Sequence, residues 1–168
     1  MTSLTVDGLT FMFPAGWIAH KYDEWSFYKN QFGNMRDGIK AIDLLALEDK
    51  HTAWFVEVKD YRLHPRTKPS DVSDEVAQKV FDTLAALLPA ATNANDASEQ
   101  GMAREVLKAN RIRVVLHLEQ PVKHSHLRPR AIDVVAVTQK LKRLLKPSEA
   151  HPIVAEKAQM GSIQWSVT

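Results

Sequence analysis

Three charged side chains fall within two strongly apolar runs of the sequence, and their spacing predicts that they meet. Asp43 lies within residues 39–48, and Glu57 and Lys59 lie within residues 53–61. A short polar segment joins the two runs, so we expect a hairpin of two strands. If the strands pair about the middle of that turn, Asp43 faces Glu57, and Lys59 shares their side because side chains alternate along a strand. The hairpin therefore predicts two carboxylates and one ammonium around one point.

The apolar surroundings of these three groups indicate what chemistry they could perform. A carboxylate within such a strand is costly unless it is paired or bound to a metal. Two facing carboxylates repel one another, which raises a pKa unless a cation lies between them. Carboxylate oxygens, a backbone carbonyl and waters suit Mg²⁺, and such an ion can polarise a phosphate and acidify a water. We therefore expect Mg²⁺ or Mn²⁺ at Asp43 and Glu57, with Lys59 stabilising charge on a phosphoryl group. The alternative is a buried ion pair without chemistry.

The same residues resemble a known motif. Ile42-Asp43, a gap of 13 residues and then Glu57-Val58-Lys59 resemble the PD-(D/E)xK nuclease superfamily, which includes restriction endonucleases and Holliday-junction resolvases. The resemblance implies that Asp43 and Glu57 ligate the metal, that the Val58 carbonyl is a further ligand, and that Lys59 is the catalytic lysine. Ile42 stands where the name of the motif has proline.

The resemblance also draws attention to Glu24. Many members of the superfamily place a glutamate on the first helix, and Glu24 lies in a segment, residues 17–31, that we expect to be helical. This implies that Glu24 joins the catalytic group near the metal. A solvated helix carboxylate is the alternative interpretation.

Two basic loops could hold a nucleic-acid backbone. The first follows Lys59 directly, and the second follows the strand expected at residues 111–118. Phosphate contacts by such loops would contribute affinity without sequence preference. The alternative is that these are ordinary solvated loops. The candidate nucleic-acid-binding residues are Arg62, Arg66, Lys68, Lys123, Arg128 and Arg130.

Composition bounds the class of protein. The chain has 168 residues, of which 45% are hydrophobic and 25% charged, and this is typical of a single globular domain. It has no cysteine, which excludes a disulfide scaffold, a thiolate metal site and a cysteine nucleophile. That absence agrees with a reducing cytoplasm, the location we expect. No apolar run could span a bilayer, so we expect no membrane association. A net charge of +2 permits a nucleic-acid partner.

The remaining elements predict an α/β domain over residues 1–168, with a core at about 17–145 and a C-terminal tail, 147–168, that can add strands. We expect a restriction-endonuclease-like mixed central β-sheet flanked by helices on both faces. The segments behind this expectation are a hairpin over residues 3–13, helices over 71–88, 97–109 and 131–145, a linker over 89–97, and weak strands near 152–156 and 162–167.

The expected function is metal-dependent hydrolysis of nucleic-acid phosphodiester bonds, with DNA favoured over RNA. The main rival is a non-catalytic nuclease-like module that binds nucleic acid or a partner protein. A second rival is a structural or assembly subunit whose ion pair only specifies the fold. The sequence leaves open whether a homodimer or a partner protein supplies specificity.

Overall fold

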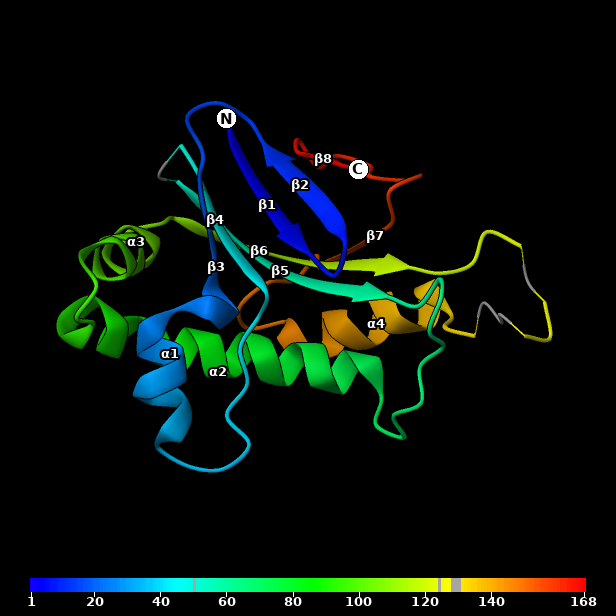
Figure 1. The fold of residues 1–168 in the computed structure, drawn as a ribbon, viewed down its shortest axis with the longest axis horizontal. Helices are drawn as coiled ribbons and strands as arrows, with labels where there is room; N and C mark the ends of the chain where they lie inside the picture. The colour runs from blue at the N-terminus through cyan, green and yellow to red at the C-terminus, as the bar shows by residue number, and fades with distance from the viewer. Residues whose placement is uncertain (50, 124, 128–130) are drawn as a thin grey trace.

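A five-stranded mixed sheet forms the centre of the molecule in a computed structural model, which describes residues 1–49, 51–123, 125–127 and 131–168 (Figure 1). Its strand order is β3-β4-β5-β6-β7. The first three strands are antiparallel neighbours, and β5, β6 and β7 run parallel. The strands are β3 (Ile18–Lys21), β4 (Leu44–Glu48), β5 (Thr52–Asp60), β6 (Arg111–Glu119) and β7 (Ile153–Ala155).

The β4–β5 hairpin has the predicted register. Leu44 pairs with Val56 and Leu45 with Phe55, so pairing is centred on the turn as expected. β4 begins at Leu44 rather than at residue 39, and Asp43 therefore lies one residue before the strand. Both strands are almost wholly buried, as is typical of strands covered on both faces.

The four α-helices of the described residues pack on one face of this sheet. They are α1 (Ser26–Asn30), α2 (Val72–Asn93), α3 (Ala97–Leu107) and α4 (Val134–Leu145). The side chains of Asp71, Asp96 and Asp133 cap the last three helices, each accepting from two backbone N–H groups. Apolar residues of these helices join Leu45 and Phe55 in one core (Figure 1). Among the described helices, none is long and apolar enough to cross a bilayer.

A small second sheet covers the opposite face of the central sheet. The expectation that helices flank both faces is therefore wrong. It consists of β1 (Thr2–Val6), β2 (Leu9–Phe13) and β8 (Ser166–Val167), in the order β1-β2-β8 (Figure 1). Alternate residues of β2 are buried, and their apolar side chains form a separate core with Trp54, Val56 and Val58 of β5. An N-terminal hairpin with one apolar face thus takes the place that we assigned to helices.

Two further expectations about local structure are corrected. Residues 17–31 form β3, the 3₁₀ turn η1 (Tyr22–Glu24) and the short α1, not one helix. Pairing of β3 with β4 overrides helix propensity there, and the Tyr22 N–H donates to the Asp43 carbonyl at 2.9 Å. The expected linker at 89–97 is helical to Asn93, because Ala90 and Ala91 are buried in the helix-side core. A second 3₁₀ turn, η2 (Phe32–Asn34), follows α1.

Candidate active site

The two predicted carboxylates meet at the open end of the β4–β5 hairpin, where a lysine from α2 joins them. Asp43 and Glu57 share the sheet face that carries Leu45 and Phe55, which is the face covered by the helices. The Lys79 ammonium lies 2.5 Å from Glu57 Oε1 and 3.4 Å from Asp43 Oδ1. Lys59 also forms an ion pair with Glu57 Oε1. The structure therefore brings Asp43, Glu57 and Lys59 together as predicted, and it adds Lys79.

Backbone hydrogen bonds hold Asp43 against the strand that carries Glu57. The N–H of Val58 donates to Asp43 Oδ2 at 2.7 Å. In an antiparallel pair a residue's N–H and C=O point to the same neighbouring strand. The Val58 carbonyl is therefore directed toward the Asp43 side, one step beyond the last ladder pair, Leu44 with Val56. The Ile42 N–H, which would face it, donates instead to the Thr83 hydroxyl at 3.2 Å.

Glu57 is the most buried charged group of the site. Only 1% of its surface is exposed, and its Oε2 atom is buried without a hydrogen-bond partner. Burial, and then the nearby Asp43 carboxylate, raise the pKa of Glu57 to about 7, while Lys79 and Lys59 oppose that shift. Burial lowers the pKa of Lys59, but the charge and hydrogen bond of the Glu57 carboxylate raise it, and the net result is a raised pKa. Lys59 is therefore a cation at neutral pH and not a general base.

The residues present fit a hard divalent cation. Glu57 Oε2 is an unpartnered buried oxygen, a feature that costs free energy unless a cation or a donor reaches it. Asp43 and Glu57 supply carboxylate oxygens, and the Val58 carbonyl is directed to the same side. This is the donor type that Mg²⁺ and Mn²⁺ accept, with waters completing the shell. In the described part of the chain, no group of three or more His, Asp or Glu side chains is placed to hold a metal ion. The fit thus depends on two carboxylates and a carbonyl.

A cleft lined by lysines opens beside the carboxylates. It has a volume of about 450 Å³, and both Lys59 and Lys79 line it. Four ammonium groups around one opening favour an anion such as a phosphate. The residues that line it are Lys40, Lys59, Lys68, Ser70, Glu75, Gln78 and Lys79.

Sequence reasoning missed Lys79, although a signal for it exists. The apolar stripe of α2 includes Val76, Val80 and Thr83, all buried. Position 79 lies three residues after 76 and four before 83, so it falls on the same side of the helix. A charged residue within an apolar stripe needs a partner. Here the partners are the two carboxylates across the helix–sheet interface.

The structure leaves the Glu24 side chain exposed and partly buries its neighbour Asp23. Glu24 is exposed at the end of η1 and pairs with Lys21, which lowers the pKa of Glu24. Its role near a metal stays a prediction, and the structure shows it bound to Lys21. The Asp23 Oδ1 atom is buried without a hydrogen-bond partner. Burial, followed by the Asp43 charge, raises the pKa of Asp23. Asp23 and Glu24 lie in the 3₁₀ turn η1, where we expected an α-helix.

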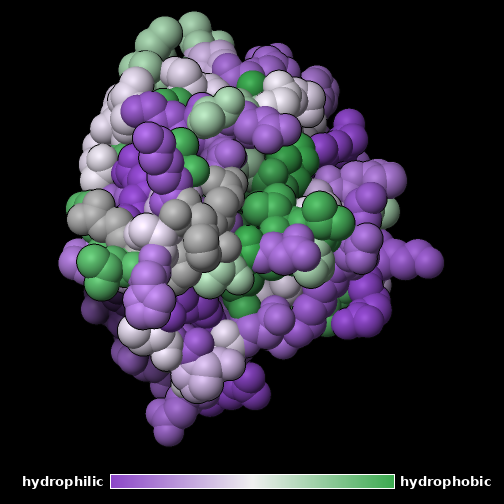
Figure 2. All heavy atoms as spheres, turned by 90° about the vertical axis from the view of Figure 1, so that its right-hand side faces the viewer, coloured by the Kyte–Doolittle hydropathy of each residue, from purple (hydrophilic) through white to green (hydrophobic). Residues whose placement is uncertain are grey.

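Two of the predicted phosphate contacts are already engaged with carboxylates. Arg62 binds Asp60 through its Nε and Nη2 atoms, with a shortest distance of 2.6 Å. Arg66 binds Glu75 at 2.8 Å and the Tyr61 hydroxyl at 2.9 Å, which ties the loop to α2. Lys68 lines the lysine cleft. Lys123 is exposed, and Arg128 and Arg130 lie outside the described residues. Figure 2 shows largely hydrophilic side chains on this side of the molecule, together with a group of apolar ones.

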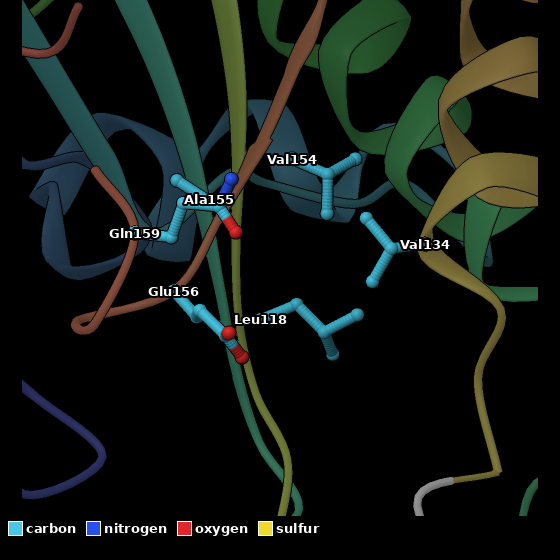
Figure 3. Close-up of a pocket in the computed structure, with 6 residues that line it drawn as sticks. All are labelled: Leu118, Val134, Val154, Ala155, Glu156 and Gln159. Carbon is cyan, nitrogen blue, oxygen red and sulfur yellow. The ribbon is translucent and has the colours of Figure 1, made fainter. Parts of the chain in front are cut away.

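A second pocket lies apart from the carboxylates, between β7, the end of β6 and the start of α4 (Figure 3). Val134 faces Val154 and Leu118 across it, and its volume is about 140 Å³. Its other lining residues are Ala155, Glu156 and Gln159. None of the predicted site residues lies among the residues that line it, and the pocket therefore contributes nothing to the carboxylate site.

Comparison with known proteins relates the whole chain to part of an enzyme. The cysteine–tRNA ligase of Neisseria meningitidis serogroup A / serotype 4A (strain DSM 15465 / Z2491) is 31% identical over an alignment of 212 residues. That alignment covers 100% of this chain and 30% of the ligase, so the chain spans less than a third of its relative. No family model and no solved structure matches the chain.

Proposed function

We propose that the chain is a Mg²⁺- or Mn²⁺-dependent phosphodiesterase that hydrolyses nucleic acid. One observation carries the proposal: two carboxylates, one with an unpartnered buried oxygen, adjoin a lysine-lined cleft. Asp43, Glu57 and the Val58 carbonyl would hold the cation. When bound, that ion would polarise the phosphate of the substrate and lower the pKa of a bound water.

The residues of the chain would then position the substrate and its charge. The lysines of the cleft bind the phosphate that is to be cleaved and its neighbours. Lys59 stays protonated and stabilises the extra negative charge as a water oxygen bonds to phosphorus and the bond to the leaving oxygen breaks. Glu57 must be ionised for this arrangement, because its carboxylate holds Lys59 in place.

The proposal leaves open which nucleic acid is the substrate, so both DNA and RNA must be screened. The resemblance to PD-(D/E)xK nucleases favours DNA. The name of the relative adds a reason to include RNA, since that protein is a tRNA ligase. Specificity could come from a homodimer or a partner protein. The rival proposal is a nuclease-like module that binds nucleic acid without cleaving it, and the lysine-lined cleft alone would support that role.

A cleavage screen tests the proposal. Single-stranded, duplex and branched DNA and tRNA are each incubated with the protein in Mg²⁺, in Mn²⁺ and in a chelator. We expect metal-dependent cleavage of at least one substrate, which Asp43→Ala and Glu57→Ala abolish. Lys59→Ala should retain metal binding and lose about 10²-fold in rate, the scale of one lost electrostatic stabiliser. Lys108→Ala is the matched control, because this exposed lysine pairs with Glu105 on α3.

Each result of the screen has a distinct meaning. Equal rates for wild type and Lys59→Ala would remove the assigned role of that lysine. Binding of nucleic acid in Ca²⁺ without cleavage in Mg²⁺ or Mn²⁺ would favour the binding module. A protein that neither binds nor cleaves would leave the carboxylate pair as a structural feature of the fold.

A further inference from the structure

Lys79 lies where a cation is needed between the two carboxylates. Its ammonium contacts Glu57 Oε1 at 2.5 Å and Asp43 Oδ1 at 3.4 Å, so this one cation reaches both carboxylates. Without this ammonium, the charges of Asp43 and Glu57 would face one another, and facing carboxylates repel. Lys79 thus offsets part of the negative charge of the pair in the metal-free protein.

A divalent cation and the Lys79 ammonium would compete for the same two carboxylates. A metal ion held by Asp43 and Glu57 would lie within a few ångströms of the Lys79 ammonium, which contacts one oxygen of each. Two positive charges a few ångströms apart repel by an amount that burial increases. Lys59 contacts only Glu57 in the described structure, so it is less affected. Metal entry is therefore coupled to the position of Lys79.

The ammonium of Lys79 could move from the carboxylates into the adjoining cleft, which its side chain lines. The side chain is 20% exposed and lines the cleft of about 450 Å³ that adjoins the carboxylates. A lysine has a flexible four-carbon stem, so its ammonium can move several ångströms while the helix stays in place. In the cleft it would lie with Lys40 and Lys68, where an anionic ligand provides a counter-charge.

We infer that Lys79 is a displaceable internal cation, which holds Asp43 and Glu57 in the metal-free protein and moves into the lysine cleft when a divalent metal binds. This inference rests on the metal site of the proposed function. It makes Lys79 a positioning residue that weakens metal binding and, once displaced, strengthens the binding of an anion in the cleft.

Titration with Mn²⁺, followed by electron paramagnetic resonance, tests the inference directly. Lys79→Met removes the charge and retains much of the apolar stem. We expect it to bind Mn²⁺ about tenfold more tightly than wild type, the scale of one unit charge removed from a few ångströms away. Lys40→Met is the matched control: it removes a lysine from the same cleft but not from the carboxylates, and we expect little change. Local damage to the fold would weaken metal binding, so a gain separates displacement from a merely structural role.

A second measurement does not depend on the variant folding. Lysine ammonium or ε-carbon resonances of the wild-type protein are followed by NMR as Mg²⁺ is added, with Lys79→Arg used for assignment. We expect the Lys79 resonance to shift with the same midpoint as metal binding. Unchanged Mn²⁺ affinity in Lys79→Met, or a Lys79 resonance indifferent to bound Mg²⁺, would overturn the inference.

The outcomes separate this inference from the proposed function. Tighter Mn²⁺ binding by Lys79→Met without cleavage of any substrate would support displacement and refute the nuclease. Cleavage by the wild-type protein, together with equal Mn²⁺ affinities of wild type and Lys79→Met, would support the nuclease and refute displacement. If neither wild type nor Lys79→Met binds Mn²⁺, both are overturned.

Discussion

At the scale of single residues, Glu57 controls the charge of the site. It is almost fully buried, it contacts both lysines through one oxygen, and its other oxygen has no partner. Burial and the Asp43 charge raise the pKa of Glu57 to about 7, within the range of working pH. A modest change in pH or in nearby charge therefore switches this carboxyl between its two forms.

The raised pKa predicts how metal binding depends on pH. Below about pH 7 a proton occupies Glu57 and competes with the metal, whereas above it the ionised carboxylate is free to bind. We expect the Mn²⁺ affinity to fall about tenfold for each pH unit below that point and to level off above it. Calorimetric titrations between about pH 4 and 8.5 measure this. Glu57→Gln should lose the inflection, and an inflection near the ordinary glutamate value of 4.5 would contradict the assignment.

Asp23 and Glu24 form a matched pair of adjacent carboxylates with different surroundings. Asp23 has a buried, unpartnered oxygen near Asp43, whereas Glu24 is exposed and bound to Lys21. Removing the Asp23 charge should weaken Mn²⁺ binding several-fold, because a negative charge near a buried cation attracts it. Asp23→Asn and Glu24→Gln are therefore compared by Mn²⁺ titration at pH 8. Equal effects of the two variants would show that Asp23 does not sense the metal.

At the scale of elements, the loop between β5 and α2 carries two kinds of cation: some are paired with carboxylates and one lines the cleft. Arg62 and Arg66 bind Asp60 and Glu75 and so brace the loop. Lys68 instead lines the cleft beside the carboxylates, where Lys40 also lies. Nucleic-acid affinity should therefore depend on the cleft lysines more than on the arginines.

Salt titrations of nucleic-acid binding, in Ca²⁺ to prevent turnover, test this division. Lys40→Ala with Lys68→Ala should weaken binding to all sequences alike and lower the slope of log K against log salt by about one unit per lost phosphate contact. Arg62→Ala should leave the slope nearly unchanged, because its charge is already neutralised by Asp60. A larger effect from Arg62→Ala than from the lysine pair would restore the simpler expectation that the whole loop contacts the backbone.

At the scale of the whole molecule, two cores lie on opposite faces of one central sheet. The helices cover the face that carries the carboxylates, and the β1-β2-β8 sheet covers the other. Val58, between Glu57 and Lys59 in sequence, has its side chain in the second core. The small sheet therefore supports the strand that carries the site from behind.

This support predicts a large effect of a substitution far from the carboxylates. Phe11 is fully buried in the small sheet and lies with its ring 5.1 Å from that of His117 on β6. Phe11→Ala should lower the free energy of unfolding by about 3–5 kcal/mol, the usual cost of truncating a buried aromatic side chain. Urea unfolding measures it, with the exposed Ser3→Ala as a control expected to change stability by less than about 0.5 kcal/mol. A loss below about 1 kcal/mol would show that the small sheet is not part of the folding unit.

The sequence by itself determined the hairpin and the meeting of its charges. Strand pairing about a short turn has a period of two, so the register that joins Asp43, Glu57 and Lys59 follows from local spacing. The start of α2, the end of α4 and the Asp96 cap of α3 were also close to prediction, since capping residues and apolar stripes are local signals.

The tertiary structure decided what covers the hairpin and which other charges reach it. Lys79 and Asp23 are distant in sequence from their partners, and only the packing of α2 and η1 against the sheet brings them near. Likewise, edge pairing with β4 turned the expected first helix into β3, because backbone hydrogen bonds across a sheet outweigh a weak local preference for helix. Local spacing predicts contacts within one hairpin, whereas contacts between elements depend on which apolar faces bury one another.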